Sequence, residues 1–557
     1  MEKPWLKFYD SFVPETIEYP QTDLYSFIKK GSAETPFKTA LSFMGKKISY
    51  EQLFDHIDRF ANGLKKLGVK QGDSITLLMP NCPQMVISYY ALMRLGAVAV
   101  LANPLNVERE LVFKIKDSSS KGMIVLDLLS NKVNNVAKEV DPGFIIYTSM
   151  KEYLPFPLNY LYPVKVKLDK RMPEVNIIKS LKTFNFSKIV EENQPIKEKI
   201  AINPDSLAVL IYSGGTTGIS KGIMLSHFAL VANILQARSW VEVSKEDSFL
   251  AVVPIFHGFG MSICMNVPLS MGGTVILLPK FDAREVVSSI VKYKPTLFAG
   301  VPTMFIAIKE LSGIANYNLR SLKGIFVGAA PLPIQVMKEF EAMTGAKLIE
   351  GYGLTEVVTG ISCNPFKGLQ KTGTIGIPMP DVEWKIVDLV DSGKSLSPGE
   401  TGEIAIRCPE FMLGYLNQPE KTAEILHDGW LYSGDIGVMD EDGYITIVDR
   451  KKDLVIVGGF NVYPSEIDEI LHQHPKVMEA IAVGLPHPQK GEYIKGYVVP
   501  KPGQKIVEGE IIDFCKKNLT AYMVPREVEL RETLPKSAIG KILRRELREE
   551  EEAKWTK

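Results

Sequence analysis

The stretch Tyr212-Ser213-Gly214-Gly215-Thr216-Thr217-Gly218-Ile219-Ser220-Lys221-Gly222 decides how this chain is interpreted. It follows an apolar run, 208–212, that predicts a buried strand, and it precedes a helix-like stretch that starts near Ser226. Glycines let a backbone turn tightly and direct several N–H groups at one anion, while hydroxyls and an ammonium add further donors. The sequence therefore predicts a phosphate-binding loop whose contacts come from Ser213, Gly214, Gly215, Thr216, Thr217, Gly218 and Lys221.

This loop differs from two better-known phosphate loops. In a Walker loop, Gly-Lys-Ser/Thr follows four spacer residues, whereas Lys221 follows Ser220 here. The G-x-G-x-x-G spacing of kinases is also absent. A flexible turn rich in glycine is the alternative interpretation. The density of hydroxyls, with a lysine, directly after an apolar strand favours phosphate binding.

Short apolar runs alternate with helical spacings through the first half of the chain. Strands are predicted at 74–79, 97–101, 123–128, 144–148 and 208–212, with helical stretches such as 84–95 between them. Short buried strands that alternate with helices imply parallel sheets. We therefore expect an α/β fold with parallel-sheet subdomains.

The pattern changes from Asp381 onward. Short strands at 382–387, 402–407 and 444–448 predict a small β-rich subdomain, and the charged segment 449–453 then leads into a compact α+β pattern. There we expect helices at 464–472 and 508–518, strands at 479–483 and 494–499, and a solvated helix end at the acidic run 549–552. The predicted domains are a large N-terminal domain, 1–448, a hinge, 449–453, and a small mobile C-terminal domain, 454–557.

Residues 154–172 interrupt the α/β pattern. They contain three prolines, several aromatic residues and a basic cluster, namely Pro155, Pro157, Pro163, Lys165, Lys167, Lys170 and Arg171. The prolines argue against a regular helix, so we predict an irregular surface loop. Apolar and basic groups together would also suit weak contact with an anionic membrane surface.

The composition excludes several classes of protein. Of the 557 residues, 45% are hydrophobic and 23% charged, as in soluble globular proteins. Sixty-five Lys and Arg balance 65 Asp and Glu, so no global field would attract nucleic acid, and no such partner is expected. The five cysteines lie far apart, which indicates a reducing compartment and disfavours a structural zinc site. With no signal core and no run of ~18 apolar residues, we expect a cytoplasmic protein without a transmembrane segment.

Two later motifs suit a nucleotide. In Gly351-Tyr352-Gly353-Leu354-Thr355-Glu356, the glycines allow close approach to a flat ring and the tyrosine offers a stacking face. Thr355 can bond phosphate, and Glu356 is a hard oxygen ligand for Mg²⁺. In the segment 430–435, Asp435 can accept from both hydroxyls of a ribose. Alone, Glu356 would be interpreted as a solvated carboxylate and Asp435 as part of a common turn.

Together these motifs resemble those of the adenylate-forming enzymes, the ANL superfamily, and in particular of medium- to long-chain fatty acyl-CoA synthetases. At least five motifs occur in the family's order between Ser213 and Lys541, so the resemblance covers essentially the whole chain. It implies that the loop holds the phosphates of ATP and that Thr216 and Glu356 hold Mg²⁺. It further implies that Gly328, Ala329 and Ala330 form a wall near adenine and the acyl group and that Gly351, Tyr352 and Gly353 belong to the second nucleotide motif. Asp435 and Arg450 would contact the ribose, and Lys452 would be the hinge about which the C-terminal domain rotates.

The resemblance also assigns the chemistry. Adenylation joins a carboxylate oxygen to the α-phosphorus and expels pyrophosphate. Lys541, in the C-terminal motif 534–545, matches the catalytic lysine, whose ammonium stabilises the charge that accumulates on oxygen. His257, in the segment 254–260, matches the gating position beside the acyl pocket, although a packed, hydrogen-bonded histidine would explain it alone.

The implied reaction is ATP-dependent conversion of a carboxylic acid to acyl-AMP and then to acyl-CoA, with ATP, Mg²⁺ and coenzyme A. A fatty acid is favoured, with aryl and short hydroxy acids open. Met261, Cys264 and Met265 would line an apolar pocket or belong to ordinary core. No carrier-protein module follows the last motif, so a free thiol is the expected acceptor. Loading of a separate carrier protein and a catalytically silent nucleotide-binding regulator are the alternatives, and a homodimer is left open.

Overall fold

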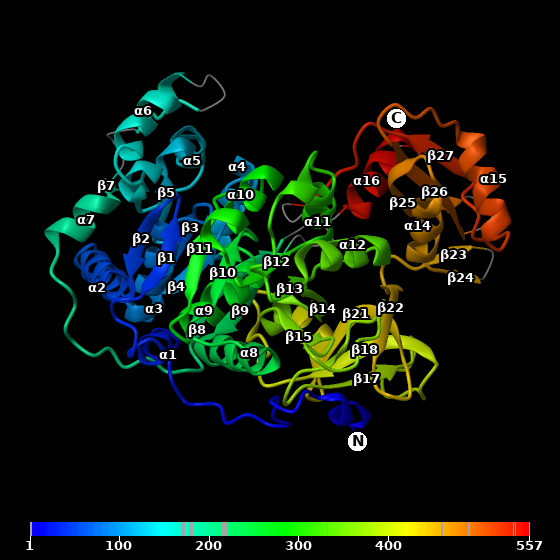
Figure 1. The fold of residues 1–557 in the computed structure, drawn as a ribbon, viewed down its shortest axis with the longest axis horizontal. Coiled ribbons are helices and arrows are strands. Elements are labelled where there is room, and N and C mark those ends of the chain that lie inside the picture. The colour runs from blue at the N-terminus through cyan, green and yellow to red at the C-terminus, as the bar shows by residue number, and fades with distance from the viewer. Residues whose placement is uncertain are drawn as a thin grey trace. The chain divides into compact units, whose positions relative to one another are not determined.

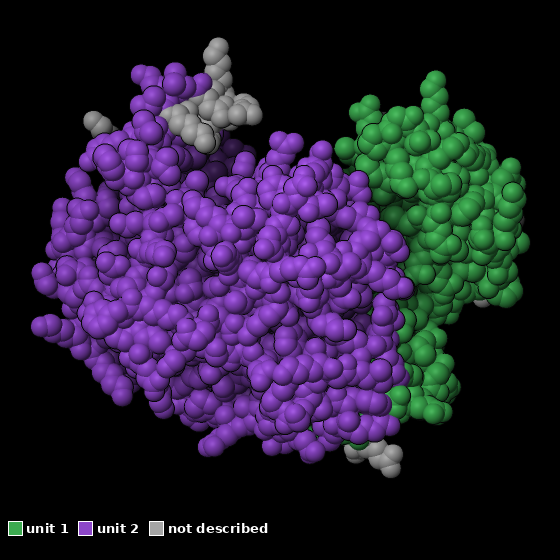
Figure 2. Space-filling view, viewed as in Figure 1, with its two compact units in different colours: residues 1–5, 383–407, 425–557 green, residues 6–382, 408–424 purple. Residues whose placement is uncertain are grey.

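The structure is a computed structural model that describes residues 3–168, 173–177, 182–213, 220–330, 332–457, 460–487, 491–537, 540 and 542–555. The chain folds into two compact units (Figure 2). The small unit comprises residues 1–5, 383–407 and 425–557, and the large unit comprises residues 6–382 and 408–424. The domain limits expected at 448 and 454 stay a prediction.

One sheet of the large unit carries the predicted phosphate loop. It has eight strands in the order β19-β9-β8-β4-β3-β5-β6-β7, and its six central and edge strands from β8 to β7 run parallel. Its strands are β3 (Ser74–Leu78), β4 (Val98–Leu101), β5 (Gly122–Leu126), β6 (Phe144–Thr148), β7 (Thr183–Asn185), β8 (Leu207–Ser213), β9 (Lys221–Ser226) and β19 (Gly414–Tyr415). Strands β5 and β6 are buried at every residue, which explains their continuous apolar sequence. The five strands expected from apolar runs in this part of the chain are confirmed.

The second sheet of the large unit delivers the later motifs. Its nine strands follow the order β16-β15-β14-β13-β12-β10-β11-β1-β2. They are β1 (Thr39–Phe43), β2 (Lys46–Ser49), β10 (Ser248–Ala251), β11 (Thr274–Leu277), β12 (Leu297–Gly300), β13 (Gly324–Val327), β14 (Lys347–Gly353), β15 (Gly360–Cys363) and β16 (Ile377–Pro378). Strands β13 and β14 are parallel neighbours, so the segments at their carboxyl ends meet at one edge. Ligands of α/β proteins bind at such edges.

Helices accompany both sheets (Figure 1). Helix α2 begins with a capping box in which Ser49 and Gln52 bond each other's backbone. Helix α3 begins at Pro83 and is capped at its C-terminus by Gly96, which has a φ of 67°. The helices between residues 24 and 425 are α1 (Leu24–Gly31), α2 (Tyr50–Lys66), α3 (Pro83–Leu95), α4 (Glu108–Asp117), α5 (Ser130–Val136), α6 (Leu158–Leu168), α7 (Phe186–Glu192), α8 (His227–Trp240), α9 (Val267–Leu269), α10 (Ala283–Tyr293), α11 (Pro302–Lys309), α12 (Ile334–Thr344) and α13 (Pro419–Ile425).

Helix α6 corrects the prediction of an irregular loop for residues 158–168 of the segment 154–172, whose last four residues lie outside the described part of the chain. Two of the three prolines precede the helix, and the carbonyl of Pro157 accepts hydrogen bonds from the N–H groups of Tyr160 and Leu161. Proline is well tolerated at a helix start, and only Pro163 lies inside. The exposed helix therefore loses one internal hydrogen bond to proline rather than three.

Strand β9 was also missed. It follows the predicted phosphate loop directly and pairs antiparallel with β8, so the loop joins two strands of a hairpin. The expected helix begins afterwards, at His227, with the Ser226 hydroxyl capping the N–H of Ala229. The loop is therefore anchored by a strand on each side.

The small unit contains two further sheets. The first has the order β17-β18-β21-β20 with β22 on β21, and the second has the order β24-β23-β26-β25 with β27 on β26. The elements are β17 (Glu383–Val387), β18 (Thr401–Arg407), β20 (Leu426–His427), β21 (Trp430–Met439), β22 (Ile445–Arg450), β23 (Val455–Val457), β24 (Phe460–Val462), α14 (Pro464–Gln473), β25 (Val477–His487), β26 (Gly491–Pro500), α15 (Glu508–Asn518), β27 (Glu527–Leu530) and α16 (Arg544–Trp555). The expected β-rich and α+β parts are confirmed.

The acidic run 549–552 is helical, as expected, but it is not solvated throughout. Glu551 is buried, and its carboxylate pairs with Lys495 at 2.8 Å and Lys554 at 2.6 Å. Burial alone would raise the pKa of Glu551, but these lysines lower it to about 2. The sequence could not show this because Lys495 lies on a distant strand, β26.

Two further observations concern surface and cysteines. Across the part of the chain that the structure describes, no helix has the length and apolar character needed to cross a bilayer. All five cysteines are buried free thiols.

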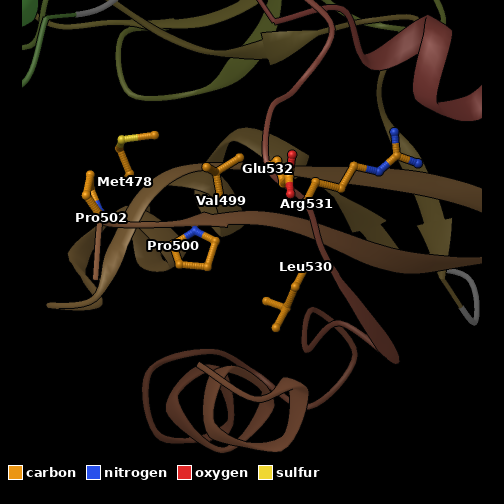
Figure 3. A pocket seen from close by; sticks show the side chains of 7 residues that line it. All are labelled: Met478, Val499, Pro500, Pro502, Leu530, Arg531 and Glu532. Carbon is orange, nitrogen blue, oxygen red and sulfur yellow. The ribbon is translucent and has the colours of Figure 1, made fainter. Parts of the chain in front are cut away.

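A shallow depression of about 490 Å³ lies on the small unit between β25, β26 and β27, where Met478, Val499 and Leu530 line it (Figure 3). None of the predicted site residues that the structure describes lines this depression.

Candidate active site

Six predicted site residues lie outside the described residues, namely Gly214, Gly215, Thr216, Thr217, Gly218 and Lys541. Their roles stay predictions. The backbone of Ser213 ends β8, and Lys221 begins β9 directly opposite it in the antiparallel register. The two ends of the predicted loop are therefore held next to each other.

A tyrosine that the sequence analysis missed connects this loop with Glu356. Tyr415 belongs to β19, which pairs with β9. The Lys221 ammonium lies 4.5 Å from the centre of the Tyr415 ring, and the Tyr415 hydroxyl donates a 2.8 Å hydrogen bond to Glu356 Oε1. The structure thus brings the loop lysine and the predicted Mg²⁺ ligand to one tyrosine. Nothing in the local sequence Gly414-Tyr415 indicates this role.

Glu356 sits on a tightly constrained single turn, η6 (Thr355–Val357). Its carbonyl accepts a 2.8 Å hydrogen bond from the N–H of Met412. Gly353, just before the turn, tolerates no side chain, because a Cβ would lie 1.5 Å from the Thr359 carbonyl oxygen. The half-buried Glu356 side chain is therefore positioned by backbone contacts on both sides.

A strained residue follows this turn. Val358 has φ 67° and ψ −61°, and the Thr359 N–H donates to the Val357 carbonyl at 2.8 Å. This is the classic γ-turn geometry, which is rare and costly for a β-branched residue. The Val358 carbonyl oxygen lies 2.3 Å from where a Cβ would stand on Gly258. The Glu356 motif and the segment of His257 are therefore packed directly together.

His257 is a neutral, partly buried histidine. Burial lowers its pKa to about 4, and Nδ1 accepts a hydrogen bond from the Phe259 N–H at 3.3 Å. It precedes a π-helix, η4 (Gly260–Asn266), a form that is frequent at functional sites. Met261, Cys264 and Met265 lie in this π-helix and are fully buried.

The small residues expected near the ligand lie at the carboxyl ends of β13 and β14. Gly328 follows β13, and its Cα faces the Phe259 ring, which a Cβ would approach to 3.5 Å. Ala329 has a φ of 72°, an unusual conformation for alanine, and Ala329 and Ala330 are exposed. Tyr352 lies on β14 opposite Ser362 of β15. The remaining members of this edge are Gly351 and Gly353, at the end of β14, and Thr355, which is half-buried.

The small unit holds the predicted ribose residues as a pair. Asp435 on β21 stands opposite Arg450 on β22, and Arg450 Nε lies 3.0 Å from Asp435 Oδ1. Asp435 is buried, and its N–H donates to the Ser433 hydroxyl, which in turn donates to the Ile404 carbonyl. Lys452 is exposed in the turn that follows β22.

A half-buried arginine, three residues after Lys541 in the sequence, contacts the predicted hinge. Arg544, at the start of α16, pairs with Asp468 of α14, and its Nη1 lies 3.7 Å from a carboxylate oxygen of Asp449 and of Asp453. Its Nε donates to the Ala482 carbonyl at 3.1 Å. Burial raises the pKa of Asp468 to about 6, because its effect exceeds the lowering effect of the Arg544 charge. The predicted hinge segment is thus bound to α14 and α16 within the small unit.

The residues present fit a Mg²⁺ ion. Glu356 offers carboxylate oxygens, the hard ligands that Mg²⁺ prefers, and its hydrogen-bond partner is the uncharged Tyr415 hydroxyl. Within the described ranges, no group of three or more His, Cys, Asp or Glu side chains is placed to hold a metal ion. A carboxylate with substrate phosphates is the usual Mg²⁺ arrangement in nucleotide sites.

Comparison with known proteins gives the same class. Residues 28–416 match the AMP-binding enzyme family, and residues 466–541 match the AMP-binding enzyme C-terminal domain. A long-chain-fatty-acid–CoA ligase of Bacillus subtilis is 40% identical over 554 residues, covering 99% of this chain and 98% of that protein. Among solved structures, ATP-bound MatB from Rhodopseudomonas palustris is 28% identical with a TM-score of 0.83, covering 95% of this chain and 99% of that one. The anthranilate CoA ligase AuaEII, in complex with anthranoyl-AMP, is 26% identical with a TM-score of 0.84, covering 98% and 99%.

The chain belongs to the AMP-binding enzyme family. The predicted resemblance, the α/β fold class and the enzyme class, an AMP-forming acid–thiol ligase, are confirmed. ATP, Mg²⁺ and coenzyme A follow as its cofactors and cosubstrates.

Proposed function

We propose that this chain is a fatty acid–CoA ligase that forms acyl-AMP from a fatty acid and ATP and then transfers the acyl group to coenzyme A. The observation that carries the proposal is the contact of Lys221 and Glu356 with Tyr415, because it joins the predicted phosphate loop to the predicted Mg²⁺ ligand. The names of the relatives at 34–40% identity support a long-chain acid as the substrate.

In the first step, a carboxylate oxygen of the acid bonds to the α-phosphorus, and the bond to the bridging oxygen of pyrophosphate breaks. Residues 213–221 bind the phosphates, and Asp435 with Arg450 binds the ribose. Glu356 and Thr216 would hold Mg²⁺, which neutralises phosphate charge when bound. Lys541 stabilises the negative charge that develops on oxygen, a contribution of ~10²–10³ in rate for one such group.

In the second step, the thiol of coenzyme A attacks the acyl carbonyl carbon and AMP leaves. The small domain rotates about Lys452 between the two steps, since a hinge needs only a few residues to absorb the change. This rotation would withdraw Lys541 after adenylation. His257, neutral at physiological pH, lines the acyl side of the site.

We place the enzyme in the cytoplasm, with peripheral membrane contact, and we leave a homodimer to measurement. Sedimentation equilibrium over a range of protein concentrations decides between a monomer and a dimer.

The reaction is tested by measuring CoA-dependent AMP release from ATP with acetate, 4-hydroxybutyrate, octanoate, palmitate and a cinnamate. We expect release with octanoate and palmitate. Release with cinnamate alone would redirect the proposal to aryl acids, as in the 4-coumarate–CoA ligase relative from Solanum tuberosum. ATP binding without release with any acid would favour a carrier-protein acceptor or a silent regulator.

The Lys541→Ala variant provides the matched control. It should stop acyl-AMP formation and largely spare thioesterification of supplied acyl-AMP. Equal loss of both half-reactions would contradict the role of Lys541.

A further inference from the structure

Exposed apolar side chains gather on helix α6 of the large unit. Phe156, just before the helix, is 81% exposed, Tyr160 is 72% exposed and Leu168 is 76% exposed. Leu161 and Val164 are each more than half exposed. Large apolar side chains this exposed on one short element indicate an interaction surface.

These side chains share one face of the helix. Residues 160, 161, 164 and 168 follow the spacing i, i+1, i+4 and i+8, which aligns them at ~3.6 residues per turn. The Phe156 ring lies edge-on to the Tyr160 ring, with centroids 6.1 Å apart, and so extends the face. On the other side, Tyr162 is partly buried where α6 packs on η3 (Met150–Tyr153). Figure 1 shows α6 at the outer margin of the large unit, in keeping with the exposure of these side chains.

Exposed basic side chains lie on this part of the chain. Of the charged side chains at 151–168 that the structure describes, Lys151 and Lys167 are exposed, and Lys167 directly precedes Leu168 of the apolar face. Glu152 is half-buried and accepts a 2.6 Å hydrogen bond from the Thr148 hydroxyl. An apolar face with basic neighbours fits a membrane surface whose headgroups are negative and whose acyl chains are apolar.

We propose that this face of α6, with Phe156, docks peripherally on a membrane that contains anionic phospholipids. The proposal rests on the proposed function, because a long-chain fatty acid partitions into membranes and a docked enzyme would meet it there. A second copy of the chain fits less well, since a symmetric contact would place the same basic side chains opposite one another.

The test is co-sedimentation of the full chain with vesicles of phosphatidylcholine containing about one third phosphatidylglycerol. We expect the wild type to sediment with these vesicles and less with pure phosphatidylcholine or in high salt. Leu161→Asp combined with Val164→Asp should lower the partition coefficient at least tenfold. Lys167→Gln should lower it about fivefold. Val390→Asp is the control, because Val390 is 96% exposed outside α6 and should sediment like wild type.

Two readouts keep the outcome interpretable. CoA-dependent AMP release with octanoate, without vesicles, should be the same in wild type and α6 variants, which shows that they are folded. Absence of AMP release in wild type would refute the proposed function, while sedimentation would still report on α6. The docking proposal is overturned if wild type stays in the supernatant or if the double variant sediments like wild type. It is also overturned if the double variant instead converts a wild-type dimer to a monomer in gel filtration.

Discussion

Glu356 and Asp435 are carboxylates that we assign to the same nucleotide, but the structure gives them different partners. Glu356 is half-buried and accepts a hydrogen bond from the Tyr415 hydroxyl at 2.8 Å. Asp435 is buried, and the Arg450 guanidinium lies 3.0 Å from it. A hydroxyl adds no charge of its own, whereas a guanidinium adds a full positive charge. Glu356 therefore has an uncharged partner, whereas the negative charge of Asp435 is balanced by the positive charge of Arg450.

This difference matches the ligands that we propose. A dication such as Mg²⁺ is attracted by a carboxylate whose hydrogen-bond partner is an uncharged hydroxyl, as it is for Glu356. A ribose is neutral. The Asp435–Arg450 pair can offer it hydrogen-bond acceptors and donors while the charges of the two side chains balance each other. The partner of each carboxylate therefore indicates the charge of the ligand that it binds.

Glu356 can be tested as the Mg²⁺ ligand by removing its charge. Glu356→Gln keeps the shape and removes the charge, so acyl-AMP formation should fall by ~10²–10³ and require more Mg²⁺. The measurement is pyrophosphate release over a Mg²⁺ titration. Glu310→Gln is the control, because that carboxylate is 68% exposed. Wild-type rates at wild-type Mg²⁺ would rule out Glu356 as the ligand.

The second half of the comparison predicts a different kinetic signature. Asp435→Asn removes the negative charge that lies 3.0 Å from Arg450 Nε, so the KM for ATP should rise ~10–100-fold, as for the loss of hydrogen bonds to a charged group, with a smaller effect on kcat. The Mg²⁺ requirement at saturating ATP should stay unchanged. Asp428→Asn, at an 86% exposed side chain, should behave like wild type. A changed Mg²⁺ requirement would erase the distinction between the two carboxylates.

Tyr415→Phe tests whether the tyrosine hydroxyl positions Glu356. It removes only the hydroxyl and keeps the ring beneath Lys221, so half-maximal adenylation should need ~10-fold more Mg²⁺. In the Glu356→Gln background the same substitution should add little, because its effect acts through Glu356. Tyr317→Phe, at a half-exposed tyrosine, is the control. Additive effects of the two substitutions would refute a positioning role.

The sequence predicted most of the architecture because the information was local. Buried parallel strands such as β5 and β6 need continuous apolar runs, and those runs are visible in the sequence. Helix α6 was missed because prolines were counted without their position, and two of the three lie before the helix starts. Strand β9 was missed because its pairing with β8, and not its six residues alone, makes it a strand.

The site was predicted as separate motifs but not as contacts. The motif around Glu356 could be identified from the sequence, whereas its partner Tyr415 lies 59 residues later in a two-residue strand. Arg544 and the hinge carboxylates Asp449 and Asp453 are likewise distant in sequence. Such partners depend on how strands and helices pack, which no local pattern reports.

A third carboxylate, Glu410, gives the smallest expected effect and shows what burial adds. Like Glu356 it has a neutral donor, the Gln236 amide at 3.0 Å, but it is fully buried, and burial raises its pKa to about 8. An unfolded chain releases this proton near the ordinary value of 4.5. Between about pH 4.5 and 8 the folded state therefore binds more protons, so the free energy of unfolding should fall as pH rises and level off above about 8.

Glu410→Gln should reduce the decrease in Tm between pH 5 and pH 8 by an amount on the order of a few °C, measured by thermal unfolding. The exposed control Glu400→Gln should keep the wild-type slope. The same dependence of Tm on pH in wild type and Glu410→Gln would show that burial does not keep this carboxyl protonated. Glu410 would then be an ionised carboxylate with a neutral hydrogen-bond donor, as we propose for Glu356.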